Sequence, residues 1–450
     1  MKPKVLWVLL VFFWVWSSPA AADNRFIVRA PSGLTSLQQV CLTLGCNVSG
    51  GLDGSVGKLF LVTTPDLVDP NVFLQILRSQ PAITNVELDA LLRVMQLGLG
   101  STPTLNGTAP ASSQNTATAP PSGLSDTTLV NYFGVMVIHG YTAQPASTII
   151  RLPDTQTSYN TTGGGTVAVI DTGIDPTHPA LQSVLVPGYD FTRNTSGSGS
   201  ELTDINQSSV GSGASPVMVN QESAAILDQT SANNLQQPQY AAFGHGTMVS
   251  GIVHLVAPSA LIMPLKAFKA DGTGNLSDVL SAIYFAVQNG ARVINMSFSL
   301  STYSQEMATA LKSASRRHVI CVASAGNDGR EEIVYPAALP DVMGVASTTN
   351  NDTRSTFSNY GADLVWVAAP GEAIITTYPF GTYGAGWGTS FSAPLVSGAA
   401  ALMVGTNMSF RESSAESALA NAVWISPDLG NGRVDLYQAV NAALSHPPNP

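Results

Sequence analysis

The stretch that most constrains how this chain folds is residues 388–404, where a short polar turn leads into a long apolar run. The turn ends at Ser390, and the residues after it are small or apolar as far as Val404. A helix with such residues on every side is buried all round and is not amphipathic. Pro394 is compatible with it, because a proline in the first turn loses no hydrogen bond. The pattern therefore predicts a core helix with Ser390 at its N-terminus, where the helix dipole and free backbone N–H groups favour negative charge.

Four segments of the chain resemble motifs of the subtilisin-like serine proteases. Gly-Thr-Ser-Phe-Ser-Ala-Pro at 388–394 is similar to the motif of the nucleophilic serine. Residues 169–175 and 244–251 resemble the segments of the catalytic aspartate and histidine, and residues 323–329 resemble the segment of the oxyanion-binding asparagine. The order Asp, His, Ser is that of the family. The resemblance covers roughly residues 160–445 and, more weakly, 25–95.

The resemblance implies peptide hydrolysis through an acyl-enzyme. Ser390 would attack the substrate carbonyl, His245 would act as the general base, and Asp171 would fix the imidazole tautomer. Asn327 and the backbone N–H of Ser390 would hold the oxyanion. This chemistry needs no cofactor. We expect activity to rise as the pH passes about 6–7, since His245 must be neutral to accept a proton.

The resemblance also implies a substrate-binding edge. In the family, the segment at Ser297, Phe298 and Ser299 pairs with the substrate backbone, and residues 323–326, which include Ala325 and Gly326, help to wall the specificity pocket. Ser299 stands where the family usually has glycine. Val334 matches a position at the pocket floor and would make the pocket shallow. We therefore expect cleavage after apolar residues of moderate size.

Strands alternate with helices from about residue 166 to 345. This order predicts an α/β fold, a mostly parallel sheet with helices on both faces. The short buried strand at 166–170 ends in Asp171, at the carboxyl edge of the sheet, where open α/β folds build their sites. We assign residues 129–450 to this catalytic domain.

Residues 1–22 have the pattern of a secretory signal peptide. Two lysines precede the apolar run 5–16, which is too short for a membrane span of about 20 residues. Small residues follow and end at Ala22, a plausible cleavage site. The sequence therefore predicts a secreted protein without stable membrane insertion; an uncleaved anchor is the alternative.

Residues 23–96 are expected to form a small α+β unit of their own. The order strand–helix–strand–strand–helix–strand is the ferredoxin-like, split βαβ pattern. The unit resembles the inhibitory pro-domain that precedes many subtilisin-like catalytic domains, and an unrelated α+β module is the alternative. We expect it to act as an intramolecular inhibitor, with its extended end, residues 87–96, lying in the substrate cleft. Residues 97–128, rich in Ser, Thr, Ala, Pro and Gly, are expected to be a disordered linker open to cleavage.

The pattern of the remaining features leaves some alternatives open. Cys41 and Cys46 either form a disulfide or remain free, while Cys321 lies in an apolar run and is expected in the core. Residues 192–242 exceed what a compact core requires, and both a substrate-shaping flap and a decorative loop fit them.

The sequence argues against three other functional classes. Asp171-Thr172-Gly173 is also the signature of aspartic proteases, but these need two such carboxylates and the sequence has one copy. A lipase-type esterase would have Gly-x-Ser-x-Gly around its nucleophile. A secreted binding protein on an inactive protease scaffold is the third class, and the presence of all four catalytic residue types argues against it.

Charge and metal patterns exclude further partners. The chain has 19 basic and 29 acidic residues and no basic run of five, so nucleic acid is not an expected partner. Many relatives hold calcium in an insertion after the catalytic histidine, and residues 251–258 lack that insertion and its carboxylates. We therefore expect no metal site there, leave structural calcium elsewhere open, and expect a monomer that acts on proteins or peptides.

Overall fold

The computed structural model describes residues 24–65, 69–94, 119–206, 208, 210–220, 222–407 and 410–445. Its chain divides into two compact units, Met1–Gly51 with Ser55–Asp89, and Leu52–Gly54 with Ala90–Pro450. The predicted signal peptide and most of the predicted linker lie outside the described residues. The unit boundary falls at residue 89, inside the expected pro-domain, so the last predicted extended segment is divided between the two units.

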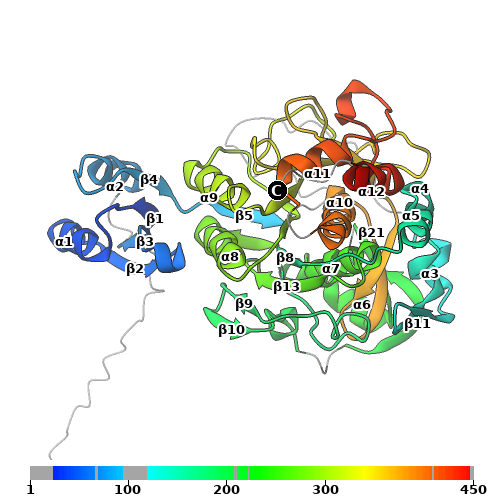
Figure 1. Cartoon of the computed structure of the whole chain (residues 1–450). Coiled ribbons are helices and arrows are strands. Elements are labelled where there is room, and N and C mark those ends of the chain that lie inside the picture. Colours follow the sequence, from blue (N-terminus) through cyan, green and yellow to red (C-terminus); the bar gives the residue numbers. More distant parts are fainter. Residues whose placement is uncertain are drawn as a thin grey trace, which may run out of the picture. The chain divides into compact units, whose positions relative to one another are not determined.

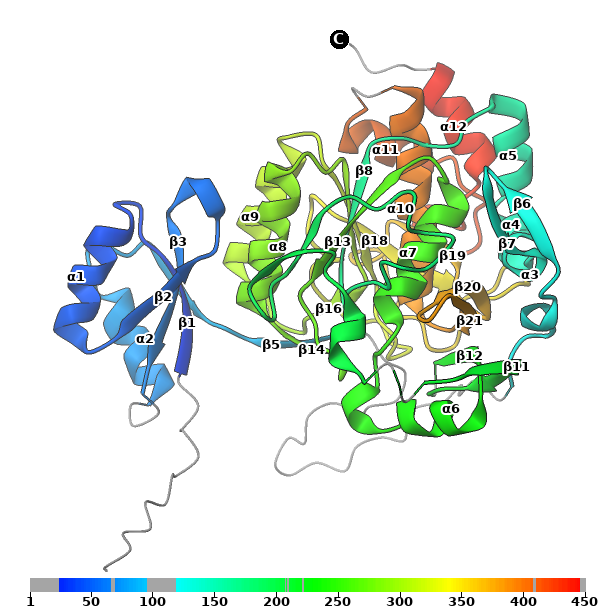
Figure 2. The same ribbon diagram turned by 90° about the horizontal axis from the view of Figure 1, so that it is seen from below.

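The N-terminal unit is a four-stranded antiparallel sheet in the order β2-β3-β1-β4. Both helices lie on one side of this sheet (Figure 2). Alternating residues of the central strand, such as Phe26 and Val28, pack there against Leu37 and Phe73. The elements are β1 (Asn24–Arg29), α1 (Leu34–Leu44), β2 (Asn47–Gly51), the 3₁₀ turn η1 (Gly54–Val56), β3 (Leu59–Thr64), α2 (Pro70–Arg78) and β4 (Asn85–Leu88).

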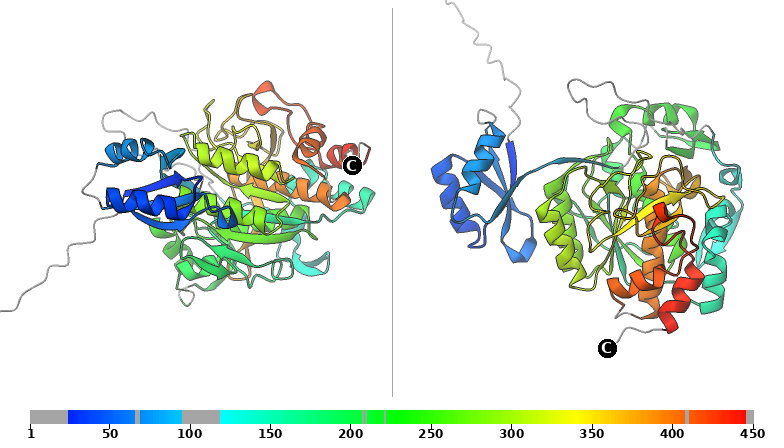
Figure 3. Two further views of the ribbon diagram at one scale, coloured as in Figure 1. Left: turned by 60° about the vertical axis from the view of Figure 1, so that its left-hand side comes forward. Right: turned by 90° about the horizontal axis from the view of Figure 1, so that it is seen from above.

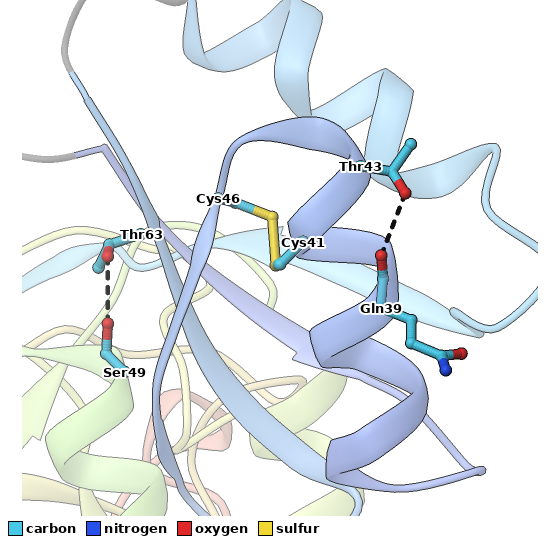
Figure 4. Close-up of a disulfide and its surroundings, with 6 residues drawn as sticks. All are labelled: Gln39, Cys41, Thr43, Cys46, Ser49 and Thr63. Carbon is cyan, nitrogen blue, oxygen red and sulfur yellow. Dashed lines mark hydrogen bonds between the residues drawn. A yellow bond between two sulfur atoms is a disulfide. The ribbon is translucent and has the colours of Figure 1, made fainter.

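A disulfide joins Cys41 to Cys46 in this unit, which decides between the two alternatives of the sequence (Figure 4). Cys41 lies in the last turns of α1, and Gly45, in the left-handed conformation at φ +74°, reverses the chain just after it. The Cα atoms of the two cysteines are 4.5 Å apart, and both side chains are buried.

The main sheet of the second unit has eight strands within the described residues, in the order β10-β9-β13-β8-β15-β17-β18-β19. Every neighbouring pair from β9 to β19 is parallel, and the edge strand β10 pairs antiparallel with β9. The predicted mostly parallel sheet is therefore confirmed. The strands are β8 (Thr166–Asp171), β9 (Gly188–Asp190), β10 (Thr195–Gly197), β13 (Leu261–Lys266), β15 (Val293–Met296), β17 (Ile320–Ser324), β18 (Met343–Thr348) and β19 (Val367–Pro370).

Helices cover both faces of this sheet (Figures 1 and 2). The helices α7 (His245–Val256) and α10 (Thr389–Thr406) pack on one face, and α8 (Leu276–Gln288) and α9 (Gln305–Ser315) pack on the other. Every residue of α10 from Thr389 to Val404 is buried, as its apolar sequence predicts. Among the described residues, α10 is the one helix long and apolar enough to cross a membrane, and 89% of its apolar window is buried inside the protein.

Residues 129–160, at the start of the predicted catalytic domain, are largely helical. They form the hairpin β6 (Leu129–Tyr132) and β7 (Val135–Ile138), followed by α3 (His139–Thr142), α4 (Pro145–Ile149) and α5 (Leu152–Tyr159). The last of these lies beside α12 (Leu436–Ser445) (Figure 3). The rings of Tyr159 and Tyr437 are 4.9 Å apart there. The 3₁₀ turn η2 (Ser122–Ser125) falls within the predicted linker, and its Leu124 is fully buried. The chain also forms α11 (Glu412–Leu419) and the 3₁₀ turn η6 (Pro427–Leu429).

The insertion at 192–242 is built of regular elements where it is described. After β10 it forms η3 (Glu201–Asp204), β11 (Ser212–Met218), β12 (Ser223–Leu227), α6 (Gln229–Leu235) and η5 (Pro238–Tyr240). A second sheet has the order β11-β12-β21-β20, in which β20 is Ile374–Tyr378 and β21 is Thr382–Gly386. All five residues of β12 are buried. Pairing with β21, which leads into the N-terminus of α10, orders this Gly/Ser-rich segment.

Candidate active site

Asp171 and His245 meet at the carboxyl edge of the main sheet. Asp171 is the last residue of β8, and His245 is the first residue of α7. The Nδ1 atom of His245 lies 2.7 Å from Oδ1 of Asp171, and both side chains are buried. The same Oδ1 accepts a hydrogen bond from the backbone N–H of Thr172 at 2.7 Å. The imidazole is therefore held in one orientation, with its Nε2 directed away from Asp171 and without a hydrogen-bond partner.

Two glycines permit this close approach. Gly244 has φ +89°, a left-handed conformation that starts α7, and a Cβ there would lie 2.7 Å from the ring of Tyr378. A Cβ on Gly246 would lie 2.0 Å from the carbonyl oxygen of Gly173. The first turn of α7 thus contacts the loop after β8 through bare backbone, which brings His245 to Asp171.

Ser390 lies in the first turn of α10 and is fully buried. Its Oγ donates a long hydrogen bond of 3.4 Å to the carbonyl oxygen of Ser297, and the Oγ of Ser297 donates to the carbonyl oxygen of Ser390 at 3.0 Å. The ring of the next residue, Phe391, lies 5.6 Å from the ring of His245. Within the described residues, no hydrogen bond joins Ser390 to His245, although the two residues come to the same edge of the sheet.

Asn327 follows β17 and reaches the N-terminus of α10. Its Oδ1 accepts hydrogen bonds from the backbone N–H and the hydroxyl of Thr389, at 2.9 and 2.8 Å. Its Nδ2 is buried without a partner. A Cβ on Gly388 would lie 3.0 Å from that nitrogen, so glycine leaves the space beside the amide open. A buried N–H donor that binds nothing is costly and marks a place where a ligand oxygen can bind.

An extended segment of the chain already occupies the predicted substrate-binding edge. The strand β5 (Leu91–Val94), which belongs to the second unit, lies between β14 (Thr273–Asn275) and β16 (Phe298–Ser299) and is antiparallel to both. Val94 pairs with Phe298, and the N–H of Val94 donates to the carbonyl oxygen of Gly272 at 2.9 Å. The strand at 298–299 therefore pairs with an extended segment of its own chain, as an added strand would.

The other two predicted substrate-binding residues lie in the turn after β17. Ala325 and Gly326 follow β17 and are buried. The N–H of Gly326 donates to the hydroxyl of Thr389 at 3.2 Å, so this turn contacts the N-terminus of α10. Val334, the expected pocket floor, is also buried.

Sequence reasoning missed two buried glutamates beside His245. Glu222 lines a small pocket together with His245 and Phe391, and burial raises its pKa well above the ordinary value. Glu201 is fully buried and hydrogen bonds to residues next to Asp171 and His245. Both lie in the insertion, where nothing but the rarity of charge in this Gly/Ser-rich segment could have singled them out.

A histidine fixed by a buried carboxylate, near a serine at a helix N-terminus, is the arrangement of serine hydrolases. The sequence model of the subtilase family, Peptidase S8, matches residues 162–440. Thermitase of Thermoactinomyces vulgaris is 31% identical over 291 residues, which cover 62% of this chain and 88% of the relative. Subtilisin BL of Lederbergia lenta is 38% identical over 187 residues, 40% of this chain and 69% of the relative. The chain belongs to the subtilase family and is a subtilisin-like serine endopeptidase.

Proposed function

We propose that the protein is a secreted endopeptidase that hydrolyses peptide bonds with Asp171, His245 and Ser390 as its catalytic triad. The observation that carries the proposal is the 2.7 Å contact between Asp171 and Nδ1 of His245, which leaves Nε2 unpartnered. In the mechanism, Nε2 takes the proton of the Ser390 hydroxyl while Oγ attacks the substrate carbonyl. His245 then returns the proton to the leaving amine, and water hydrolyses the acyl-enzyme by the same route.

The oxyanion of the tetrahedral intermediate would bind at the N-terminus of α10. The unpartnered Nδ2 of Asn327 and the backbone N–H of Ser390 are the donors we assign to it. The Asn327 donor is fixed before substrate binds, because Thr389 holds the other end of its amide. Such preorganised donors act strongly on charge that develops in a buried site.

The substrate would bind as an added strand at the edge formed by residues 297–299. The antiparallel pairing of β5 supports this binding mode, and we propose that β5 is the end of an inhibitory pro-domain that occupies the cleft of the precursor. Leu92 and Val94 of β5 are buried, while Leu91 and Arg93 are exposed, so alternate side chains enter the site. The family resemblance assigns Ala325 and Gly326 to the wall of the specificity pocket and Val334 to its floor. We therefore propose cleavage after apolar residues of moderate size.

The proposed precursor is exported by the signal peptide at 1–22, processes itself after β5, and acts as a monomer on protein or peptide substrates without a catalytic cofactor. The chemistry is tested by zymography of the secreted protein with and without a serine-directed fluorophosphonate. We expect complete loss of the cleared band after labelling, and labelling of Ser390 by mass spectrometry. Cleavage that persists after full labelling, with a maximum near pH 4, would favour the aspartic-protease alternative instead.

A further inference from the structure

We propose that Glu201 is a positioning residue, which holds the loop after Asp171 against the first turn of α7 and thereby sets the geometry of the Asp171–His245 pair. The inference rests on the proposed triad and concerns a residue outside it. Glu201 begins η3 in the insertion and is fully buried.

The carboxylate of Glu201 contacts both catalytic segments. Its Oε2 accepts hydrogen bonds from the hydroxyl of Thr172, at 3.1 Å, and from the backbone N–H of Gly244, at 2.9 Å. Its Oε1 accepts a short hydrogen bond from the hydroxyl of Thr247. Thr172 directly follows Asp171, and Gly244 directly precedes His245. One carboxylate therefore bridges the neighbours of both members of the pair.

The direction of each hydrogen bond is determined by the backbone. The N–H of Gly246 donates to the hydroxyl oxygen of Thr172 at 3.0 Å, and the N–H of Asp175 donates to the hydroxyl oxygen of Thr247 at 2.7 Å. Each hydroxyl accepts from an N–H and so directs its own proton at Glu201. Three donors thus converge on Glu201, and an acceptor-only group satisfies all three, which is the ionised carboxylate.

The backbone around Glu201 is held without this carboxylate. The N–H of Glu201 donates to the carbonyl oxygen of Ile174 at 3.1 Å, and the N–H of Ile174 donates to the carbonyl oxygen of Gly199 at 3.1 Å. The loop would therefore stay in place if the side chain lost its acceptors. What the carboxylate adds is the link between the Asp171 loop and α7.

Burial and the charged groups that face Glu201 set the pH at which its carboxyl group ionises. From β13, Lys266 binds the carbonyl oxygen of Thr172 and the carboxylate of Asp204, each at 2.7 Å, and Arg193 also contacts Asp204. Burial, with a smaller contribution from Asp171, raises the pKa of Glu201 to about 8 despite Lys266 and the hydrogen bonds that lower it. Tyr378 and His245 are the other titratable groups on this side. Below about pH 8 one carboxyl oxygen of Glu201 carries a proton, which faces the donors from Thr172, Gly244 and Thr247. All three hydrogen bonds are therefore accepted only above about pH 8.

Kinetics of Glu201→Gln test the proposal. Glutamine keeps the shape but turns one acceptor oxygen into a donor that faces other donors. We expect kcat to fall about ten- to a hundredfold, because a small misplacement of a catalytic group has effects of that size, while KM changes less than about twofold. We also expect wild-type kcat to rise a second time near pH 8, above the rise from His245, and this second rise to be absent in the variant.

Glu412→Gln is the matched control. Glu412, in α11, is a buried glutamate whose pKa burial also raises to about 8, and its Oε1 has no hydrogen-bond partner. This variant should keep the wild-type kcat and the wild-type pH profile. If it loses the rise near pH 8 as well, that rise does not report Glu201 and the proposal is wrong.

A second pair of variants applies if Glu201→Gln folds poorly. Thr172→Val removes the hydroxyl that links Gly246 to Glu201 and should lower kcat, whereas Thr172→Ser keeps the hydroxyl and should restore it. Equal kcat in the two variants, or a Glu201→Gln enzyme with a lower melting temperature but wild-type kcat and pH profile, overturns the positioning role. Ser390→Ala separates this outcome from failure of the triad, since turnover by Ser390→Ala would contradict the proposed function itself.

Discussion

Gly246 and Gly173 approach so closely that a Cβ on residue 246 would lie 2.0 Å from the carbonyl oxygen of residue 173. One glycine lies in the first turn of α7 and the other in the loop after β8, next but one to Asp171. The contact between bare backbones is what permits the 2.7 Å bond between Asp171 and His245. The missing side chains of these two glycines, which are far apart in the sequence, therefore set the distance between Asp171 and His245.

Gly246→Ala should force these two segments apart. The neighbouring Gly173 carbonyl is backbone, which cannot move aside, so we expect a destabilisation of about 1–3 kcal/mol and at least a tenfold loss of kcat. Chemical denaturation and steady-state kinetics measure the two effects. A fully active Gly246→Ala enzyme would show that the close approach is not required.

Ser390→Ala and His245→Ala should each abolish hydrolysis while the fold is retained.

Asn327→Ala should lower kcat by roughly 10²–10³, because the unpartnered Nδ2 is the donor assigned to the oxyanion. That magnitude is known for subtilisin, a member of this family, and is carried over rather than predicted from this structure. Circular dichroism of the three variants checks the fold, and an Asn327→Ala enzyme with unchanged kcat would remove Asn327 from the oxyanion site.

The sequence predicted the parallel sheet and the core helix well, because both depend on local pattern. The apolar run after Ser390 is α10, and the strand expected at 166–170 is β8. The strand β2, with the sequence Asn-Val-Ser-Gly-Gly, has little strand propensity and forms because β3 pairs with it. Likewise β12 is ordered by β21, a partner that lies more than 150 residues away. Such pairings leave no local signal.

The candidate site likewise has residues that a local sequence pattern reveals and residues that it does not. Motif resemblance marked Asp171, His245, Ser390 and Asn327, and the structure brings all four to one edge of the sheet. Glu201 was missed because its role depends on three hydrogen-bond donors from two distant segments. A lone glutamate in a Gly/Ser-rich stretch has no spacing that reveals them.

Glu201 should also make stability fall as the pH rises. Its pKa is about 8 in the folded protein and near 4.5 when exposed, so the folded state binds this proton more tightly. The contribution to stability is therefore full below about pH 4.5 and is lost as the pH rises through about 8, by at most roughly 5 kcal/mol. Denaturation of Ser390→Ala with and without Glu201→Gln, at pH 5 and pH 9, measures it in an inactive background. A difference between the two proteins that does not change with pH would contradict the raised pKa.

Removal of the Cys41–Cys46 disulfide should destabilise the N-terminal unit only modestly. The two cysteines are five residues apart, and a loop this short restricts the unfolded chain by about 2 kcal/mol. Cys41→Ser with Cys46→Ser should therefore leave the unit folded but raise hydrogen exchange in β1 and β3. Reductant should reproduce the effect in the wild type and add nothing in the double variant. Exchange that is unchanged by both treatments would mean that the bond does not form in the protein.

The last prediction concerns maturation. Val94, the last residue of β5, pairs with Phe298, and the neighbouring Ser297 accepts the hydrogen bond of the Ser390 hydroxyl. We expect self-cleavage between Gln96 and about Asp126, followed by loss of residues 23–96. The Ser390→Ala protein should accumulate as a precursor that lacks only its signal peptide, because it cannot cut the segment that occupies its own cleft.

Intact mass and N-terminal sequencing of the secreted wild type and of Ser390→Ala measure this directly. Addition of a trace of mature wild type to purified Ser390→Ala precursor should release the N-terminal unit with the same new N-terminus, which shows that the bond is accessible and that only the nucleophile was missing. If purified Ser390→Ala is trimmed at the same place without added protease, self-processing is wrong. If active wild type keeps residues 23–96 covalently attached, the N-terminal unit is no removable pro-domain, and β5 must leave the edge at 297–299 by a conformational change before any substrate can pair there.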